Sequence, residues 1–245
     1  MYYKLLFILL FSSCLAYSQS NLEIIYKKKV LPEYLDVDDS LSIDKKQNYS
    51  RIRNSVKNHI GKHTYSLSID SGSSVSLFEV VNTMDIDGNE RFNNSLKGIL
   101  GSRFPIYNNL KKDSIYENAD FRGMNYFTRY KSPRYDWDFK NETKQILGFK
   151  CYLAVAKVKN DATLFDFKDG KTQSFYAWYA PSLPSRYGPS FFTGLPGLVL
   201  KAGNDKFEIY AVKIEEIDQV KFKFPNKTSI TENQKLMKLQ NLIRK

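Results

Sequence analysis

The sequence predicts a mainly β protein, folded as an antiparallel curved sheet or partly open β-barrel with a C-terminal α-helix. β-branched and aromatic residues recur in short runs bounded by Gly, Asn, Asp and Ser, which is typical of strands and turns. Helical periodicity is clear only close to the C-terminus. The chain has 245 residues, 42% of them hydrophobic, so it is long enough to bury a core and fits the size of one large all-β domain.

The N-terminal residues 1–18 have the pattern of a secretory signal peptide. Lys4 is followed by the apolar run Leu5–Phe11, which is too short to span a bilayer, and Ala16-Tyr17-Ser18 has the small-x-small form of a cleavage site. We therefore expect residues 19–245 to form one exported domain, found in the periplasm, on the outer membrane surface or secreted. No later stretch is long and apolar enough to cross a membrane, so no transmembrane segment is expected in the mature chain.

The two cysteines bear on processing and on chemistry. Cys14 follows Phe11-Ser12-Ser13, which is similar to a lipobox, so lipidation of Cys14 is the alternative to cleavage after Ser18. That cleavage would leave Cys151 as the single cysteine and would exclude an intramolecular disulfide. Cys151 lies in a mostly apolar run, where a small buried side chain is the expected role and a nucleophile is the alternative.

The first half of the chain predicts strands separated by two polar insertions. Leu22–Val30 is a first strand, and residues 64–81 form a hairpin because two alternating runs flank a turn of Gly and Ser. Residues 36–58 and 82–112 have no clean period and are expected to form loop-like insertions. One short helix is expected inside the first insertion, around residues 45–57.

The second half predicts further strands and a terminal helix. Leu236, Leu239 and Leu242 recur at helical spacing, and Thr231-Glu232-Asn233-Gln234 has the form of a capping box, so a helix is expected at about 231–245. The expected strands are 114–117, 125–130, 137–139, 150–158, 173–178, 198–201 and 207–214.

Histidine, the commonest metal ligand and general base, occurs only as His59 and His63. Their i, i+4 spacing would place both on one face of a helix, but Gly61 lies between them and an alternating strand follows. Two solvent-facing histidines are therefore expected, and a metal pair is the alternative. The chain has no Gly-rich phosphate loop, Cys-x-x-Cys pair or His-Glu-x-x-His helix, so neither a cofactor nor a catalytic residue is expected.

The chain is strongly basic, with a formal charge of +11 from 37 Lys and Arg against 26 Asp and Glu. The basic residues are scattered along the sequence, and an exported protein rarely meets nucleic acid, so nucleic acid is not an expected partner. A solvated surface, or weak attraction to anionic lipid or polysaccharide, accounts for the charge.

Four motifs follow one another in the stretch 146–200. They are Ile146-Leu147-Gly148-Phe149-Lys150-Cys151-Tyr152, Ala177-Trp178-Tyr179-Ala180-Pro181, Tyr187-Gly188-Pro189 and Gly194-Leu195-Pro196-Gly197-Leu198-Val199-Leu200. This ordered series resembles the GLPGLI family of exported Bacteroidetes proteins, with Val199 where the name-giving motif has Ile. Trp137 and the hairpin at 64–81 fit the weaker N-terminal pattern of that family, so the resemblance covers nearly the whole mature chain. It implies an exported envelope protein and assigns no biochemical function or catalytic residue.

The segment 180–197 is expected to be a stiff, extended connection, because four prolines restrict its backbone. Pro196-Gly197 is expected to form a type II turn with positive φ at Gly197, as a structural corner before the last hairpin. The residues of this structural motif are Gly188, Pro189, Gly194, Leu195, Pro196, Gly197 and Leu198. The large apolar side chains on and beside the segment must be buried, pair with one another or line a groove for a ligand or partner: Trp178, Tyr179, Tyr187, Phe191, Phe192 and Leu195.

Two functions of different classes follow from these observations. The first is a non-catalytic envelope module that binds an apolar ligand or a partner protein, because the chain combines an export signal with an aromatic-rich connection and lacks a catalytic set. The alternative is a secreted hydrolase that uses Cys151, or a metal held by His59 and His63.

Overall fold

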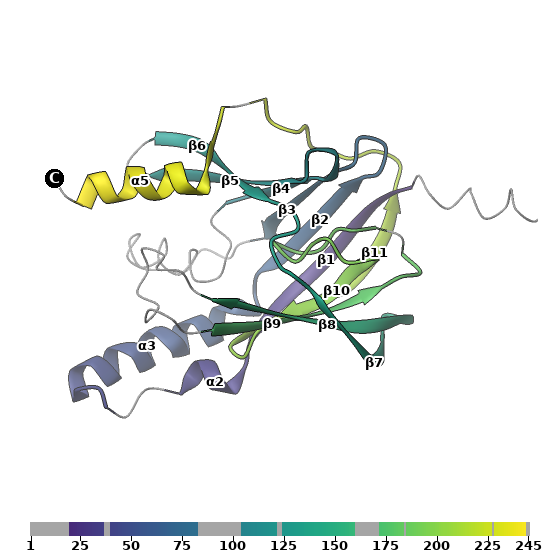
Figure 1. Ribbon diagram of the computed structural model, residues 1–245. Helices are drawn as coiled ribbons and strands as arrows, with labels where there is room; N and C mark the ends of the chain where they lie inside the picture. Colours follow the sequence, from purple (N-terminus) through teal and green to yellow (C-terminus); the bar gives the residue numbers. More distant parts are fainter. Residues whose placement is uncertain are drawn as a thin grey trace, which may run out of the picture.

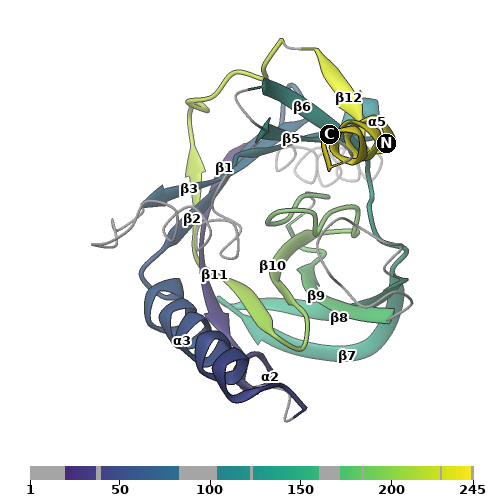
Figure 2. The ribbon, with the colours of Figure 1, turned by 90° about the vertical axis from the view of Figure 1, so that its left-hand side faces the viewer.

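In the computed structural model, one strongly curved sheet organises the protein (Figure 1). The structure describes residues 20–36, 40–82, 104–121, 124–159, 172–183, 185–226 and 228–243. Within these ranges twelve strands follow the order β12-β6-β5-β4-β3-β2-β1-β11-β10-β9-β8-β7, and all neighbours are antiparallel except β12 and β6. The sheet curves into a C that does not close (Figure 2), which confirms the predicted fold class.

The strands coincide with the runs of β-branched and aromatic residues. The first six strands are β1 (Asn21–Val30), β2 (Thr64–Asp70), β3 (Val75–Asn82), β4 (Ile106–Asn109), β5 (Ser114–Phe121) and β6 (Met124–Lys131). The other six are β7 (Asp138–Ile146), β8 (Phe149–Lys159), β9 (Thr172–Ala180), β10 (Leu198–Gly203), β11 (Phe207–Ile217) and β12 (Ser229–Thr231). The expected hairpin at 64–81 is confirmed as the antiparallel pair of β2 and β3.

The short helix expected around residues 45–57 is confirmed, but it is longer than expected and fills most of the segment 36–58, which is therefore not loop-like. Helix α3 (Ile43–Ile60) occupies it, and the short helix α2 (Pro32–Leu35) precedes it. Only Val56 and Ile60 of α3 are buried, so apolar side chains recur too rarely to give the sequence a strong helical period. These two residues pack against the end of β1 and the start of β11, and this contact fixes the helix on the sheet.

The second expected insertion, at 82–112, also contains regular structure. Strand β4 and the 3₁₀-helix η2 (Leu110–Lys112) lie at its end, while residues 83–103 fall outside the described part of the chain. Strand β4 was missed because two of its four residues are asparagines, which are rare in strands. Residues 1–19, with the expected signal peptide and Cys14, also fall outside the described residues.

The main core lies on the concave face of the sheet. Side chains alternate between the faces of a strand, so Ile24 and Tyr26 of β1 point to the same side as their register partners Leu67 and Tyr65 of β2. All four side chains are at most 1% exposed. Figure 2 shows the connection between β9 and β10 inside the C, where it covers these residues. The concave face is therefore filled by the chain itself over much of its area.

The two edges of the sheet are protected in different ways. β12 is a three-residue strand that pairs in parallel with β6, and helix α5 (Glu232–Ile243) follows it directly. β7 is exposed from Asp138 to Gln145, but its pairing with β8 is irregular between Phe139 and Thr143. A bulged, charged edge resists pairing with another chain.

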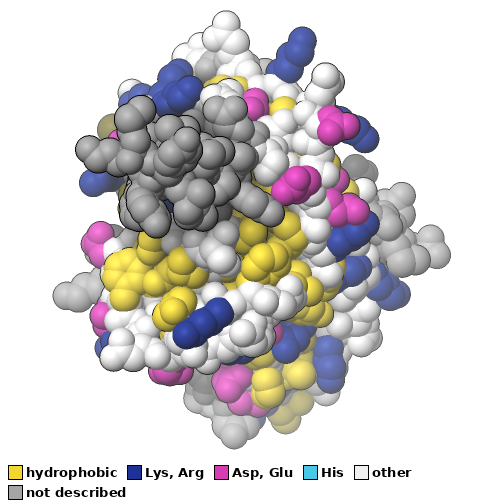
Figure 3. Space-filling view, turned by 90° about the vertical axis from the view of Figure 1, so that its right-hand side faces the viewer, with side chains coloured by type: hydrophobic (Ala, Val, Ile, Leu, Met, Phe, Trp, Pro, Cys, Tyr) yellow, Lys and Arg dark blue, Asp and Glu magenta, His cyan; other side chains and the backbone are white. Residues whose placement is uncertain are grey.

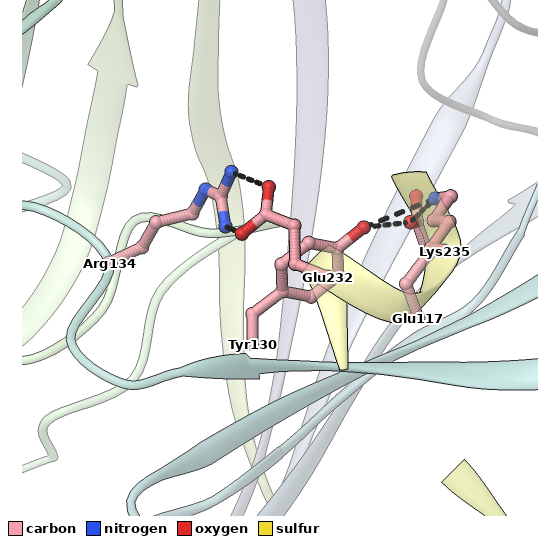
Figure 4. A network of polar contacts seen from close by, with 5 residues as sticks. All are labelled: Glu117, Tyr130, Arg134, Glu232 and Lys235. Carbon is pink, nitrogen blue, oxygen red and sulfur yellow. Dashed lines mark hydrogen bonds and ion pairs between the residues drawn. The ribbon is translucent and has the colours of Figure 1, made fainter. Parts of the chain in front are cut away.

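Helix α5 confirms the predicted C-terminal helix and its capping box. The Thr231 backbone N–H donates to the Gln234 side chain (2.8 Å), and the Gln234 N–H donates to Thr231 Oγ1 (3.3 Å). Figure 4 shows two further polar anchors at this helix. Arg134 forms a bidentate ion pair with Glu232, at 2.8 and 3.1 Å.

The second anchor joins α5 to the neighbouring strands (Figure 4). The Tyr130 hydroxyl of β6 donates to Glu117 of β5 (2.8 Å), and the Lys235 ammonium of α5 lies 3.3 Å from the same carboxylate oxygen. Paired charges with hydrogen bonds fix a helix orientation more firmly than an isolated surface pair does. The capping box that predicts the helix is a local sequence signal, whereas the contacts of Tyr130, Glu117 and Lys235 determine where α5 packs on the sheet.

Apolar side chains also reach the surface. Figure 3 shows hydrophobic side chains gathered across the middle of one face, with charged side chains around them. Phe139 and Leu147 are 55% and 44% exposed. Within the described ranges, none of the helices has both the length and the apolarity needed to cross a bilayer.

Candidate ligand-binding cavity

The segment between β9 and β10 folds back on itself and is not the extended connection that its prolines predict. Its internal backbone hydrogen bonds include three that join distant parts of the segment: Gly194 N–H to Arg186 O, Leu198 N–H to Leu183 O, and Val199 N–H to Tyr187 O, at 2.9 to 3.1 Å. The Trp137 indole N–H also donates to Thr193 O (3.0 Å). Prolines restrict each φ, but contacts with the sheet decide the path of the chain.

The turn at Pro196-Gly197 also differs from the expected type II turn. The Gly197 N–H donates to Leu195 O (2.9 Å), which is the three-residue closure of a γ-turn. The φ of Gly197 is 159°, far from the value of about +80° that a type II turn requires. Glycine is needed here for another reason: a Cβ would lie 2.3 Å from Ala180 O and 2.5 Å from Ala180 C.

The motif residues mostly lie inside the protein. Pro196 is exposed, Gly194 is half-buried, and the others are buried: Gly188, Pro189, Leu195, Gly197 and Leu198.

Three of the six residues expected to form a groove belong to the core. Leu195, Tyr187 and Tyr179 are 0%, 3% and 7% exposed and pack in the concave core. The Tyr26 hydroxyl donates to Val199 O (2.6 Å) and ties the segment after Leu195 to the centre of the sheet. These three side chains therefore fill space and do not line an open groove.

The other three predicted residues are separated by the structure. Trp178 lies on the convex face, because it precedes the inward-pointing Tyr179 on the same strand. Phe191 packs edge-on against Tyr130, with ring centroids 5.2 Å apart. Phe192 lines a cavity on the concave face.

This cavity has a volume of about 190 Å³ and lies on the concave face. Its apolar wall consists of aromatic rings from β2, β3, β9 and the adjoining segments: Tyr65, Phe78, Tyr135, Phe175 and Phe192. Tyr65 and Phe78 stack at 5.7 Å with an interplanar angle of 2°, and Tyr135 and Phe175 stack at 4.9 Å. Paired rings keep their faces in fixed orientations, so the cavity is preformed for a flat apolar group.

Among the described residues that line the cavity, one carries a positive charge, and it comes from the sheet. This residue is Lys28 of β1, which points to the concave face together with Ile24 and Tyr26 because alternate residues of a strand share a face. Its ammonium lies 4.9 Å from the ring centroid of Phe207. Desolvation lowers the pKa of Lys28 from its ordinary value of 10.5 to about 8. Lys28 is therefore still mostly protonated at neutral pH, where an anionic group beside it would offset the cost of desolvation.

Sequence reasoning placed neither Lys28 nor the rings of Tyr65 and Phe78 at a site. One signal was available, because Lys28 interrupts the apolar alternation of Ile24 and Tyr26. The rings carried no such signal, since alternating strands of this kind are ordinary core strands.

The residues of the alternative hydrolase do not assemble a reactive centre in the described structure. Cys151 is fully buried, as expected, and desolvation raises the pKa of its thiol to about 11. Its Sγ–H donates to Phe149 O at 3.5 Å. A thiol in this state supplies almost no nucleophilic thiolate at neutral pH.

The expectation of two solvent-facing histidines is wrong for His63, which is 2% exposed. His59 Nδ1 lies 2.7 Å from Ser55 O and His63 Nδ1 lies 3.0 Å from His59 O, so both rings bond to the backbone. Helix α3 ends at Ile60 with Gly61 as its C-cap, so the helical i, i+4 face does not extend to His63. No group of three His, Cys, Asp or Glu residues suited to a metal occurs among the residues that the structure describes.

Comparison with known proteins gives a family match for one part of the chain. Residues 137–201 match the family described as "Protein of unknown function (Porph_ging)". This segment contains the motifs that carry the resemblance to the GLPGLI family, and membership of that family stays a prediction. No curated protein matches the sequence.

Similarity to solved structures concerns the fold. "Structure of PNGF-II in P21 space group" is 16% identical with a TM-score of 0.53, and the match covers 92% of this chain and 33% of that one. "Structure of PNGF-II in C2 space group" has the same identity and coverage with a TM-score of 0.52. The chain thus spans a third of the length of these two solved structures, and at this identity the likeness shows a shared fold alone.

Proposed function

We propose that this protein is a non-catalytic binding module that holds a small, flat apolar ligand with a carboxylate or similar anionic group in the concave cavity. The observation that carries the proposal is the combination of stacked rings with the Lys28 ammonium around a space of about 190 Å³. A closed apolar cavity of roughly 150 Å³ is sufficient for benzene, so this space suits a ligand slightly larger than one ring.

The expected interactions divide between the rings and the amine. The rings of Tyr65, Phe78, Tyr135 and Phe175 supply apolar contact and stacking. Lys28 supplies a charge-assisted hydrogen bond, which is worth about 1.5–3 kcal/mol where water is excluded. Selectivity for an acid over its neutral amide therefore depends on Lys28.

Calorimetric titration with indole-2-carboxylate and its neutral amide tests this division. We expect Lys28→Met to weaken binding of the carboxylate roughly tenfold or more and to leave binding of the amide unchanged. Lys27→Met is the matched control, because Lys27 is the neighbouring lysine and points to the opposite face. Equal affinity of the carboxylate for both variants, or no binding to the unmodified protein, would refute the proposal.

The proposed location is outside the cytoplasm, and it is supported by the signal-like pattern of residues 1–18. Intact-mass analysis of the protein from its natural host tests this proposal. A mass that begins at Gln19 is expected, whereas a mass that begins at a diacylated Cys14 would show that the lipobox interpretation is correct.

A further inference from the structure

A row of alternating aromatic and lysine side chains crosses the convex face of the sheet. Strand register places Trp178 of β9 opposite Lys201 of β10, Lys201 opposite Tyr210 of β11, and Tyr210 opposite Lys27 of β1. We call these four residues the convex row; all of them are partly exposed. Neighbouring strands lie about 4.8 Å apart, so the two rings, and likewise the two lysines, repeat at roughly 10 Å.

Both lysines of the convex row are held in place: Lys27 donates to Thr64 Oγ1 at 2.8 Å, and Lys201 pairs with a carboxylate in the next row of the sheet. The carboxylate of Glu208 lies 2.8 Å from Lys201 and 3.0 Å from Lys29, and it accepts the Tyr176 hydroxyl at 2.8 Å. Tyr176 reaches Glu208 over Gly203, which has no side chain. Burial opposes ionisation, yet the hydrogen bonds from these three partners hold the pKa of Glu208 below its ordinary value. One ionised carboxylate therefore orders two lysines.

Lys144 of β7 extends the row at its other end. Its ammonium lies 4.7 Å from the ring centroid of Trp178. Desolvation and the nearby charge of Lys201 lower the pKa of Lys144, so the cations are close enough to repel one another. Glu208 pairs with Lys29 and Lys201 only, so the positive charges of Lys27 and Lys144 are not neutralised by it and this group of residues keeps a net positive charge.

We propose that the convex row is a docking surface for an acidic polysaccharide in which a charged sugar alternates with a neutral one. The rings of Trp178 and Tyr210 would stack on sugar faces, and the lysines between them would pair with the acidic groups. The alternation of ring and cation along the row matches that order of groups along such a chain. This site goes beyond the proposed function, because it lies on the face opposite the cavity.

The curvature of the sheet favours a flexible polymer over a membrane. Figure 2 shows that this side of the sheet is the outside of the C. A flat bilayer surface would touch such a convex face along a narrow strip, whereas a polysaccharide chain can follow the row from Lys27 to Lys144. Charge attraction in either case is weakened by salt.

Calorimetric titration with a hyaluronate octasaccharide, in which a uronic acid alternates with an uncharged sugar, tests the proposal. The double variant Lys27→Gln/Lys144→Gln is chosen because neither lysine bonds to Glu208. We expect it to bind at least roughly tenfold more weakly and with a shallower salt dependence. Trp178→Ala is expected to lose affinity while it keeps the salt dependence. The matched control Lys111→Gln/Lys150→Gln removes two exposed lysines elsewhere and should change the affinity less than about twofold.

Two other probes give the outcomes that would overturn the proposal. Equal affinity for neutral dextran would show that the lysines have no role. Binding of phosphatidylglycerol vesicles without binding of hyaluronate would identify the surface as a membrane contact. An equal loss in the control double variant would show that only net charge matters. Thermal melts of each variant confirm that it is folded.

Discussion

Replacing Gly197 with alanine would place a methyl group inside the backbone of the preceding strand end. The new Cβ would lie 2.3 Å from Ala180 O, 2.5 Å from Ala180 C and 2.8 Å from Pro181 N, whereas ordinary contact distances are 3.4–4 Å. Two backbone segments must then separate by about 1 Å, and neither is a flexible side chain. Overpacking of this kind lowers the free energy of unfolding by about 3 kcal/mol or more. Alanine also stiffens the unfolded chain, which restores roughly 0.5–1 kcal/mol.

Thermal melting followed by circular dichroism measures the effect. For a domain of this size 1 kcal/mol corresponds to roughly 2–4 °C, so Gly197→Ala should lower the Tm by about 5–10 °C. Two glycines with open space provide the controls. Gly148 has a φ of +82°, and a Cβ added there would meet no described atom within 4 Å beyond its chain neighbours, so Gly148→Ala should cost only about 1 kcal/mol.

The second control has neither a close approach nor a left-handed backbone. Gly61 has a φ of −69° at the end of α3, and a Cβ added there would meet no described atom within 4 Å outside the adjoining backbone, so Gly61→Ala should raise the free energy of unfolding by roughly 0.4–1 kcal/mol. The expected order of Tm is therefore Gly61→Ala, Gly148→Ala, Gly197→Ala. If Gly197→Ala melts as Gly148→Ala does, close approach is not the reason for glycine at this motif.

Three further outcomes follow from the core. Leu195→Ala should lower the free energy of unfolding by about 2–5 kcal/mol in urea titrations, because Leu195 is fully buried; a loss below about 1 kcal/mol would contradict its assignment to the core. Tyr187→Phe should be neutral or slightly stabilising, since the buried Tyr187 hydroxyl has no hydrogen-bond partner among the residues that the structure describes. Tyr26→Phe should instead cost about 1 kcal/mol through the lost bond to Val199 O, and equal effects of the two substitutions would be inconsistent with these contacts. Lys28→Met should be more stable than the unmodified protein at pH 7, because the lowered pKa of Lys28 means that the unfolded state binds the proton more tightly than the folded state does. The free-energy cost of keeping a charged Lys28 in the folded protein is complete below about pH 8 and disappears as the pH rises to 10.5. A stability difference between the two proteins that does not change over this pH window would exclude the desolvated amine.

The local pattern of the sequence determined most of the strands and the terminal helix. Period-two alternation located the pair of β2 and β3, and the capping box located the start of α5 at Thr231. These features depend on neighbours a few residues apart, so they can be read from the chain directly. The concentration of motifs between 146 and 200 likewise indicated the segment that the family match covers.

The tertiary structure alone decided the features that bear on function. Trp178 and Tyr179 are adjacent in the chain but lie on opposite faces, so one motif contributes to two different surfaces. The path of the segment after β9 is set by bonds to Trp137 and Tyr26, which are far away in sequence. The cavity arises where rings from separate strands meet Lys28 across the sheet. Such contacts join residues whose spacing carries no period, and only the packing of the curved sheet brings them together.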